Sequence, residues 1–377
     1  MNKEINRIIA NVFLVLGLLT LNFSCVRNRN LKELAEHLRV KNNIPGMAVA
    51  VVRADTIPEI FVLGHRRGGH PDKVQLDDLF HIGSNTKAMT AFAAAHLVEQ
   101  GIIDWSSRFF DLYPDWKNEI DSSHWDVKLG GLLSHRAKIK PYWTEEEFDS
   151  LELIPINLGT KSERRRAFSK YVLTQPPTIP DSIGYRYSNA GYSIAAQMLE
   201  KASDMTWEEL LLKVFNNDLN LGIGFSWPNK VDENQPWGHW TEDGQLSTCP
   251  PDDDYNLDFL EPGGDVHISL PSYCKFIQLQ LQGLSGRDNY LKSSTYDLLH
   301  NDRKNSVYAY GWANFVQDDY NYSWHAGSAG TFLTKVFIDK TASVAYIVMM
   351  NTNSPEAWNL ETELREKMED LYGGSEN

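Results

Sequence analysis

The sequence predicts an α+β protein with two lobes, in which both ends of the chain build one sheet and the middle is mostly helical. Three observations predict this fold class. An amphipathic helix and two apolar runs follow the N-terminal segment, strand-like runs and a helix fill residues 301–377, and helical patterns with long loops lie between them. A chain of 377 residues can bury such a core as one large domain or as two closely packed ones.

The N-terminal contribution to the sheet begins with a helix. Leucine and alanine recur with helical spacing over residues 31–38, and Ile44-Pro45-Gly46 ends that pattern. Two apolar runs, 47–52 and 59–63, are separated by a short polar stretch, which is typical of a β-hairpin. An alanine-rich run over 87–99 then predicts a helix.

The C-terminal contribution consists of four strands and a final helix. Turn-forming residues separate four runs of strand-like composition, at 308–316, 320–324, 331–338 and 343–350. Ser354 followed by Pro355 predicts the start of the helix. We therefore expect one domain over residues 31–377, in which 31–100 and 301–377 form an α/β lobe and 101–300 form a helical lobe. The two ends are expected to share one antiparallel sheet.

The charge of the chain argues against nucleic acid as a partner. The formal net charge is −14, whereas binding to phosphates requires a basic face. One basic run, Arg164-Arg165-Arg166, is short, and we expect it to be a solvated face of a helix.

The N-terminus has the pattern of a targeting segment. Lys3 and Arg7 precede an apolar run that ends at Ser24-Cys25, which predicts a secretory signal peptide over residues 1–24. The small residue before Cys25 indicates a bacterial lipoprotein site, with residues 25–30 as a lipidated cysteine and tether. The protein is then expected in the cell envelope, exported and held at a membrane by its lipid. Plain secretion and a retained anchor are the alternatives.

Cys249 and Cys274 are the remaining cysteines. An exported protein permits a disulfide between them, although the sequence cannot show that they meet. Neither lies in a C-x-x-C pattern, so metal or redox chemistry is not indicated. Cys274 lies in a helical pattern and is expected to be a small buried apolar residue.

Ser84 and Lys87 are the first candidate catalytic pair. Side chains three residues apart share one face of a helix, so the lysine amine could take the proton of the serine hydroxyl. At the start of a helix, Ser84 would also lie beside free backbone N–H groups that favour an oxyanion. The same spacing occurs at Ser272 and Lys275, so this pair alone is weak evidence.

Two further motifs could complete such a site. Tyr187 followed by Asn189 offers a hydroxyl for proton transfer, whose pKa a nearby lysine could lower, and an amide that could orient the lysine and a substrate. His325 and Gly327 lie in a run of small residues at the expected start of a strand, where a ligand backbone could approach closely. Taken singly, a half-buried tyrosine and a loose turn explain these segments equally well.

Together, the three motifs resemble the serine penicillin-binding protein and β-lactamase superfamily, in its class C-like branch. The resemblance rests on the order Ser84-x-x-Lys87, Tyr187-x-Asn189 and His325-x-Gly327, and on flanking segments such as Leu132-Leu133-Ser134-His135 and Gly263-Gly264-Asp265. It runs from about residue 31 to residue 353. The resemblance implies a β-lactamase/transpeptidase-like fold, with a five-stranded antiparallel sheet flanked by helices and a mostly helical second lobe. The active site would lie between the two.

The resemblance also implies roles for individual residues. Ser84 would be the acylated nucleophile, Lys87 its activator and Tyr187 a proton shuttle, while Asn189 would hold Lys87 and the substrate amide. His325 and Gly327 would line the substrate strand, and the amides of Ser84 and Ser328 would form the oxyanion hole. Which of Lys87 and Tyr187 is the general base stays open, because coupled groups titrate together.

The sequence departs from the class C pattern at His325, where those β-lactamases have lysine, and at Ala326, which lacks the hydroxyl of their threonine. A histidine is a weaker carboxylate anchor than a permanent cation, which favours esterase or peptidase activity over efficient β-lactam hydrolysis. The expected function is a serine hydrolase that uses no cofactor and acts on an ester, a D-amino-acid peptide of the cell wall or a β-lactam. A penicillin-binding sensor and a noncatalytic binding protein of the same fold are the alternatives. A metal hydrolase is disfavoured, since the histidines are scattered without H-E-x-x-H spacing.

Overall fold

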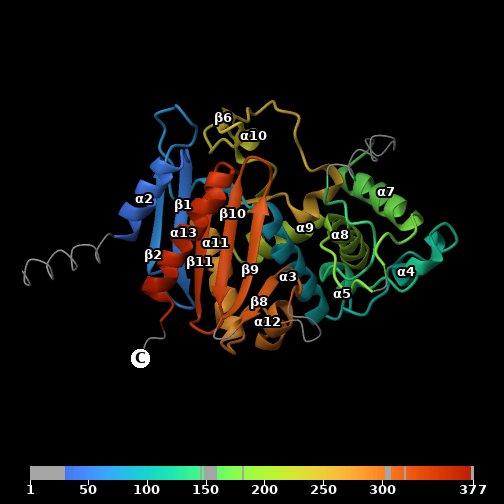
Figure 1. Ribbon diagram of the computed structural model, residues 1–377. Helices are drawn as coiled ribbons and strands as arrows, with labels where there is room; N and C mark the ends of the chain where they lie inside the picture. The colour runs from blue at the N-terminus through green and yellow to red at the C-terminus, as the bar shows by residue number, and fades with distance from the viewer. Residues whose placement is uncertain are drawn as a thin grey trace, which may run out of the picture.

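A computed structural model describes residues 30–144, 147, 159–180, 182–301, 307–317 and 320–374. Its centre is a six-stranded antiparallel sheet with the order β2-β1-β11-β10-β9-β8, so both ends of the chain share one sheet, as predicted (Figure 1). The strands are β1 (Gly46–Arg53), β2 (Glu59–Gly64), β8 (Ala313–Gln317), β9 (Tyr320–Ser328), β10 (Leu333–Asp339) and β11 (Val344–Met350).

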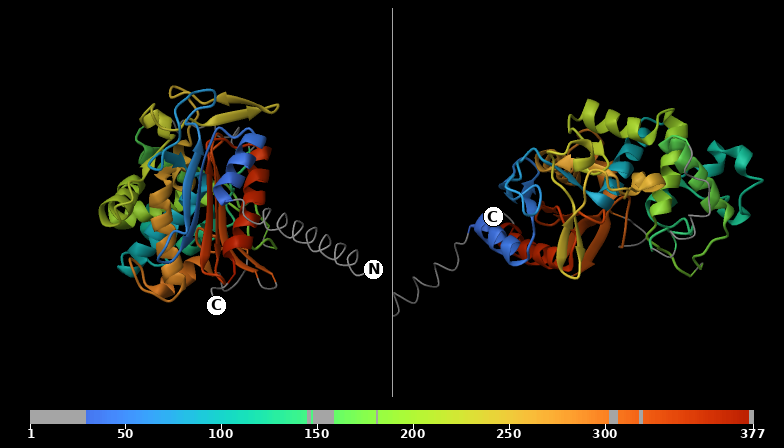
Figure 2. Two further views of the ribbon diagram at one scale, coloured as in Figure 1. Left: turned by 90° about the vertical axis from the view of Figure 1, so that its left-hand side faces the viewer. Right: turned by 90° about the horizontal axis from the view of Figure 1, so that it is seen from above.

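Helices cover both faces of this sheet. On one face, α2 (Leu31–Lys41) and α13 (Pro355–Tyr372) lie side by side, as the left view of Figure 2 shows. The opposite face packs against α3 (Thr86–Glu99) and α11 (Leu270–Leu284). Strand β1 is buried on both sides, because Met47 and its alternate neighbours face α2 and α13 while Ala48 and its alternate neighbours face the larger core.

The second lobe lies beside the β9 side of the sheet (Figure 1). Its helices surround α8, which is buried along most of its length and packs against α5 and α7. They are α4 (Phe109–Leu112), α5 (Leu129–Leu133), α7 (Lys161–Thr174), α8 (Asn189–Ser203) and α9 (Trp207–Leu211), with the 3₁₀ turns η2 (Pro114–Trp116) and η3 (Ser122–His124) and the π-helical turn η4 (Leu212–Asp218).

Several shorter elements complete the fold. Two small sheets have the orders β3-β7-β4 and β5-β6. Their strands are β3 (Leu79–His81), β4 (Gly224–Phe225), β5 (His239–Glu242), β6 (Gln245–Thr248) and β7 (Val266–Ser269). The remaining elements are the 3₁₀ segments η1 (Gly83–Asn85) and η5 (Asp258–Gly263) and the helices α10 (Pro228–Val231) and α12 (Ser293–His300).

The structure corrects the expected strands and one lobe boundary. The sheet has six strands rather than the five implied by the resemblance, because β8 adds a hairpin strand to the edge of β9. This edge strand begins at Ala313, and Tyr308 forms only an isolated bridge to it. Strand β9 continues to Ser328 because β10 pairs with it throughout. Helix α11, within the range assigned to the helical lobe, packs against β1 and β11.

Arg165 corrects the expectation of a solvated basic face on α7. Its side chain is 0% exposed and reaches carboxylates from three other elements, at 2.8 Å from Glu200, 2.7 Å from Glu208 and 3.1 Å from Glu261. Burial alone would lower the pKa of Arg165, but the three carboxylates raise it above its ordinary value. This buried cluster joins α7, α8, α9 and η5. Arg166, the next residue, is exposed as expected.

Cys249 and Cys274 are both free and buried, so they do not form the disulfide that export would permit. Cys274 lies in α11 as a small buried residue, as predicted. The expected signal peptide and Cys25 lie outside the described residues. Within the described part of the chain, none of the helices has the length and apolar character needed to cross a membrane.

Candidate active site

Ser84 lies in the 3₁₀ turn η1, between strand β3 and helix α3. The turn depends on Gly83, whose φ of +50° suits glycine and whose added Cβ would lie 2.6 Å from Ser328 N. The Gly83 N–H donates to His81 Nδ1 over 3.1 Å, and this hydrogen bond stabilises the turn. Ser84 is half-buried while every other residue from 81 to 90 is buried, so the hydroxyl is the accessible group of this segment.

Lys87 occupies the first turn of α3 beneath Ser84 and is fully buried. Its amine donates to Gly263 O over 2.7 Å and to Asn189 Oδ1 over 2.9 Å, and it lies 3.3 Å from Ser84 Oγ. Burial lowers the pKa of Lys87 well below its ordinary value. Burial is the cause of that shift, and it makes loss of the proton easier, which suits an amine that must accept the proton of Ser84.

Tyr187 and Asn189 approach the pair from the start of α8. The Tyr187 side chain hydrogen-bonds that of Ser84, and Lys87 Nζ lies 4.8 Å from the centre of the Tyr187 ring. The expectation of a lowered pKa for Tyr187 is wrong, because burial raises the pKa of this hydroxyl far above its ordinary value. Tyr187 is thus a protonated hydroxyl next to an amine whose pKa is lowered. That pairing suits proton uptake by Lys87 and donation by Tyr187.

The β9 strand forms the opposite wall. Gly327 lies so close to η1 that an added Cβ would be 1.9 Å from Ile82 O and 2.8 Å from Ser84 N. Only glycine permits this approach. As a result, the backbone of η1 at Ser84 lies directly against the backbone of β9 at Ser328, and the amides of the two residues come close together. Pairing with β8 stops at Trp324. Among the residues that the structure describes, the edge of β9 from His325 to Ser328 therefore has no strand partner on that side.

His325 lies buried at the start of this open edge. Its Nδ1 is 2.9 Å from Ala326 O and its Nε2 is 3.0 Å from the hydroxyl of Tyr308. Burial and the nearby Lys87 lower the pKa of His325 to about 3. The imidazole is therefore neutral, which strengthens the expectation that this position is a poor anchor for a carboxylate.

The structure thus brings together every site residue named from the sequence except Cys25, which is not described. Sequence reasoning missed two contributors. Gly263 supplies the carbonyl that holds Lys87, and its only signal was the Gly263-Gly264-Asp265 run, to which no role was assigned. Tyr308 contacts His325 but is one of 16 tyrosines, with no distinguishing local pattern. The twin residue Lys275 is exposed on α11.

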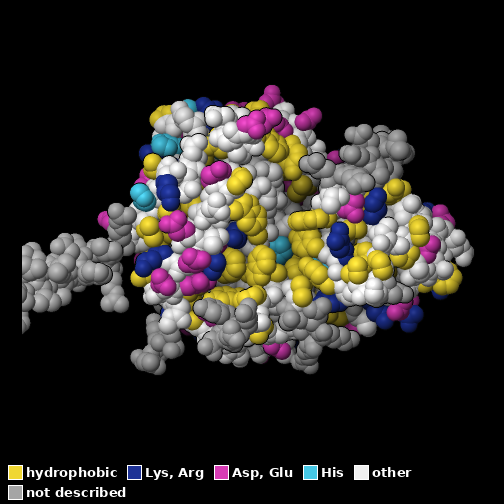
Figure 3. All heavy atoms as spheres, viewed as in Figure 1, with side chains coloured by type: hydrophobic (Ala, Val, Ile, Leu, Met, Phe, Trp, Pro, Cys, Tyr) yellow, Lys and Arg dark blue, Asp and Glu magenta, His cyan; other side chains and the backbone are white. Residues whose placement is uncertain are grey.

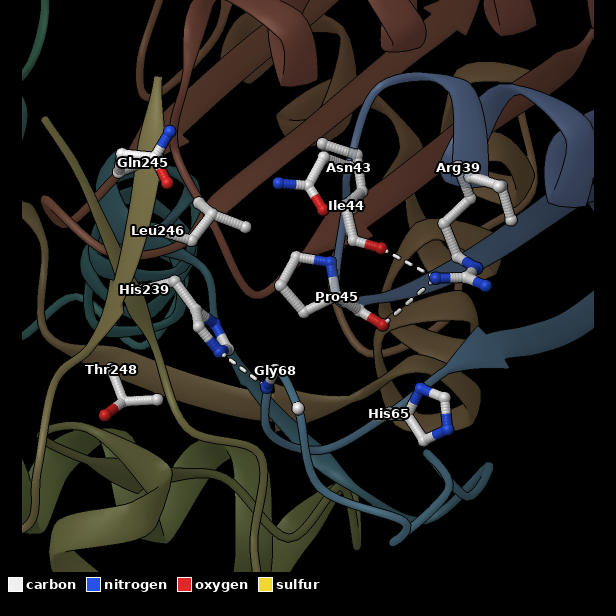
Figure 4. A pocket seen from close by; sticks show the side chains of 12 residues that line it. Arg39, Asn43, Ile44, Pro45, His65, Gly68, His239, Gln245, Leu246 and Thr248 are labelled. Carbon is white, nitrogen blue, oxygen red and sulfur yellow. Dashed lines mark hydrogen bonds between the residues drawn. The ribbon is translucent and has the colours of Figure 1, made fainter. Parts of the chain in front are cut away.

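A separate pocket of about 570 Å³ lies at another place on the molecule, between the turn after α2 and the β5–β6 hairpin. Figure 4 shows Arg39, Pro45 and His239 lining it, with His239 Nε2 accepting the Gly68 N–H. None of the motif residues lines this pocket. Among the described residues, no group of three or more His, Cys, Asp or Glu side chains is placed to hold a metal ion.

Comparison with known proteins identifies the family. The profile of the family described as Beta-lactamase matches residues 29–367, which is most of the chain. The chain belongs to the Beta-lactamase family. Sequence similarity within it is low: Protein flp of Staphylococcus aureus (strain COL) is 18% identical over 322 residues, covering 85% of this chain and 62% of flp. The chain therefore spans less than two thirds of the length of the curated relatives it matches first.

Solved structures of other Beta-lactamase-like proteins share the fold. A penicillin-binding protein from Bacillus halodurans superposes with a TM-score of 0.71 at 18% identity, over 88% of this chain and 99% of that one. The D-alanine carboxypeptidase AmpC from Burkholderia cenocepacia gives a TM-score of 0.68 at 16% identity, over 89% and 99%. These similarities confirm the predicted β-lactamase/transpeptidase-like fold.

Proposed function

We propose that this member of the Beta-lactamase family is a serine hydrolase that forms an acyl-enzyme on Ser84. One observation carries the proposal. Lys87 is a fully buried amine 3.3 Å from Ser84 Oγ, held by Asn189 and Gly263, and burial lowers its pKa well below the ordinary value. A neutral lysine so close to a hydroxyl is suited to act as its general base, whereas a solvated lysine would carry a proton at neutral pH.

The residues support a two-step reaction. Lys87 takes the proton from Ser84 Oγ as the oxygen attacks the substrate carbonyl, and the Ser84 and Ser328 amides stabilise the oxyanion. Tyr187 donates a proton to the leaving group as the carbonyl–leaving-group bond breaks, and the Lys87 ammonium restores the tyrosine proton. Water then attacks the acyl-enzyme and gives its proton to the same pair, which passes a proton to Ser84 Oγ as the carbonyl–Oγ bond breaks and the acid is released.

The open edge of β9 supports a substrate with an extended backbone beside Ser84. From His325 to Ser328, where β9 has no partner on this side among the described strands, backbone groups other than Ala326 O could hydrogen-bond an amide of the substrate, as an added strand would. An ester, a D-amino-acid peptide and a β-lactam all present a carbonyl that could reach Ser84. The alternative is a penicillin-binding sensor that is acylated without turnover, which the same residues would allow.

Intact-mass spectrometry tests the proposal directly. Incubation with a fluorophosphonate or with benzylpenicillin should add one probe to the wild type, because the activated hydroxyl is phosphonylated or opens the lactam ring. Ser84→Ala should give no adduct. Ser272→Ala is the matched control, since it removes the serine of the second Ser-x-x-Lys pair and should keep the full adduct.

The outcomes separate the competing functions. An ester-derived adduct that decays with product release supports the hydrolase, whereas a β-lactam adduct that persists, with no ester turnover, supports the sensor. Absence of an adduct with every probe would point to a noncatalytic binding protein. Full hydrolytic activity in Ser84→Ala would refute the assignment of the nucleophile.

We also propose that the protein is exported and anchored to a membrane through a lipid on Cys25. The sequence before Cys25 supports this proposal, since an apolar run behind two basic residues ends at Ser24-Cys25. In a bacterial host, the wild type should sediment with membranes, and Cys25→Ser should move to the soluble fraction or stay as an unprocessed precursor. Membrane attachment of a fully processed Cys25→Ser protein would contradict the anchor.

A further inference from the structure

The segment that leads from η5 into β7 lies against the catalytic turn η1. Val266 O accepts the Ile82 N–H over 2.9 Å, and the Val266 N–H donates to Thr86 Oγ1 over 3.1 Å. These two hydrogen bonds hold the chain on both sides of Ser84. The preceding residue, Asp265, is 3% exposed, so its carboxylate is buried beside the same turn and depends on its protein partners for compensation.

The Asp265 carboxylate lies between the catalytic turn and the helical lobe. Its Oδ1 is 3.5 Å from His81 Nε2, and its Oδ2 is 3.5 Å from the ammonium of Lys161 on α7. At this distance the contact with His81 is electrostatic rather than a full hydrogen bond, and the low dielectric of the interior strengthens it. Lys161 is half-exposed on its helix, so the imidazole is the buried partner of the carboxylate.

Gly83 and Asp265 select the same tautomer of His81 from opposite sides of the ring. The Gly83 N–H can only donate, so His81 Nδ1 carries no hydrogen and accepts this bond over 3.1 Å. The ring hydrogen then lies on Nε2, the nitrogen that faces Asp265. Within the described part of the chain, Nε2 has no hydrogen bond that could hold this hydrogen instead. The ring plane is fixed by stacking on Trp227, with 4.8 Å between the ring centroids.

Both side chains are too deeply buried to touch a substrate. Figure 3 shows hydrophobic side chains gathered between the sheet and the helical lobe, whereas His81 and Asp265 are buried inside the molecule. An effect of Asp265 on the reaction must therefore pass through His81 and Gly83 to Ser84. Because a small displacement of a reacting group can greatly slow its reaction, the turn is sensitive to this support.

We propose that Asp265 is a positioning residue for the nucleophile: it favours the His81 tautomer that accepts the Gly83 N–H, and it thereby fixes the turn that carries Ser84. This inference rests on the proposed acyl-enzyme chemistry at Ser84. It has a consequence that packing alone would not have, because the effect of replacing the carboxylate by an amide should depend on Lys161.

Asp265→Asn separates positioning from packing, because asparagine keeps the shape of aspartate. Lys161 can only donate, so the asparagine oxygen should face Lys161 and the NH₂ group should face His81 Nε2. The imidazole hydrogen then moves to Nδ1, where it opposes the Gly83 N–H. The rate of Ser84 acylation at saturating p-nitrophenyl acetate should fall about tenfold or more, while the half-saturating ester concentration should change less than about twofold.

Removal of Lys161 provides the rescue. In Asp265→Asn/Lys161→Met, the amide can turn its oxygen toward the hydrogen on Nε2, and acylation should return to within about threefold of the wild-type rate. Lys161→Met alone should stay within about twofold, as expected for a half-exposed ion pair. Lys170→Met is the matched control, because Lys170 also lies on α7 but pairs with Glu119 at 2.7 Å. Adding Lys170→Met to Asp265→Asn should recover nothing.

Nuclear magnetic resonance of protein labelled with ¹⁵N-histidine measures the tautomer independently of activity, and His81→Gln assigns the signal. His81 should carry its hydrogen on Nε2 in the wild type and on Nδ1 in Asp265→Asn.

Three results would overturn the inference: a wild type with the hydrogen on Nδ1, an Asp265→Asn enzyme that acylates at the wild-type rate, or a loss of rate that Lys161→Met does not recover. The last would mean a merely structural role for Asp265. Failure of the proposed function looks different, since the ester would then not acylate Ser84 even in the wild type, whatever the tautomer of His81.

Discussion

Replacing Lys87 by methionine should lower kcat/KM for ester hydrolysis by about 10³-fold or more, while the protein stays folded. General base catalysis contributes roughly 10²–10⁴-fold, and loss of the amine also removes the group that reprotonates Tyr187. Methionine matches the length of the lysine stem and leaves no charge in a site that is fully buried. The rate should therefore fall because of chemistry and not because of unfolding, which a thermal unfolding curve checks.

Lys275→Met is the matched control for this experiment. Lys275 belongs to the other Ser-x-x-Lys pair and is exposed on α11, so its loss should leave kcat/KM unchanged. A Lys87→Met enzyme that keeps activity within tenfold of the wild type would transfer the role of base to another group, with Tyr187 as the next candidate.

The pH dependence follows from the same amine. Lys87 must be neutral to accept the proton of Ser84, and its folded-state pKa is lowered well below the ordinary value. The kcat/KM of the wild type should thus fall as the pH drops through the folded-state pKa of Lys87, and this acid limb should lie well below the ordinary pKa of a lysine. An acid limb centred near pH 10 would show that the amine is not desolvated in solution.

Replacing Arg165 by methionine should reduce the free energy of unfolding by about 3–5 kcal/mol, the usual cost of removing one partner from a buried ion cluster. The guanidinium is fully buried among Glu200, Glu208 and Glu261, and their carboxylates would lose the cation that compensates them. Urea unfolding monitored by tryptophan fluorescence measures the change. Two further substitutions, Arg166→Met and Glu261→Gln, test whether the loss of stability comes from the buried cluster.

Arg166→Met is the control next in the sequence. Arg166 is exposed and only lies over the rings of Tyr113 and Trp116, at 5.7 and 5.5 Å, so its removal should cost less than about 1 kcal/mol. Adding Glu261→Gln to Arg165→Met should recover part of the loss, since it removes the most deeply buried of the three carboxylates, to which Lys161 remains the nearest cation at 3.7 Å. Equal effects of Arg165→Met and Arg166→Met would contradict the cluster.

Local patterns in the sequence predicted most of the fold. Apolar runs bounded by turn residues located the six strands of the large sheet, and the Ser354-Pro355 step located the start of α13, because each signal lies within a few consecutive residues. The short strands β3 to β7 were not predicted. The end of β9 was missed for the opposite reason. Its small residues resemble a loose turn, and only pairing with β10, which is not visible in the local sequence, extends the strand to Ser328.

Residues that belong to a sequence motif could be predicted from the sequence. Residues that meet only through the tertiary fold could not. Ser84, Lys87, Tyr187 and Asn189 could be named from spacing and order. The partners of Arg165 could not, because Glu200, Glu208 and Glu261 are brought to it by three separate elements. The raised pKa of Tyr187 was missed similarly, since burial is a property of the assembled core and outweighs the nearby lysine.

The point at which β8 stops pairing has a consequence for solubility. An unpaired strand edge is a template for association with the edge of another molecule, and sheet proteins usually cover or interrupt such edges. Here β8 covers β9 up to Trp324, and the helical lobe stands beside the part that follows (Figure 1). The helical lobe therefore also keeps a second sheet from pairing with the β9 edge after Trp324. Substitutions that loosen the lobe should promote aggregation as well as inactivation.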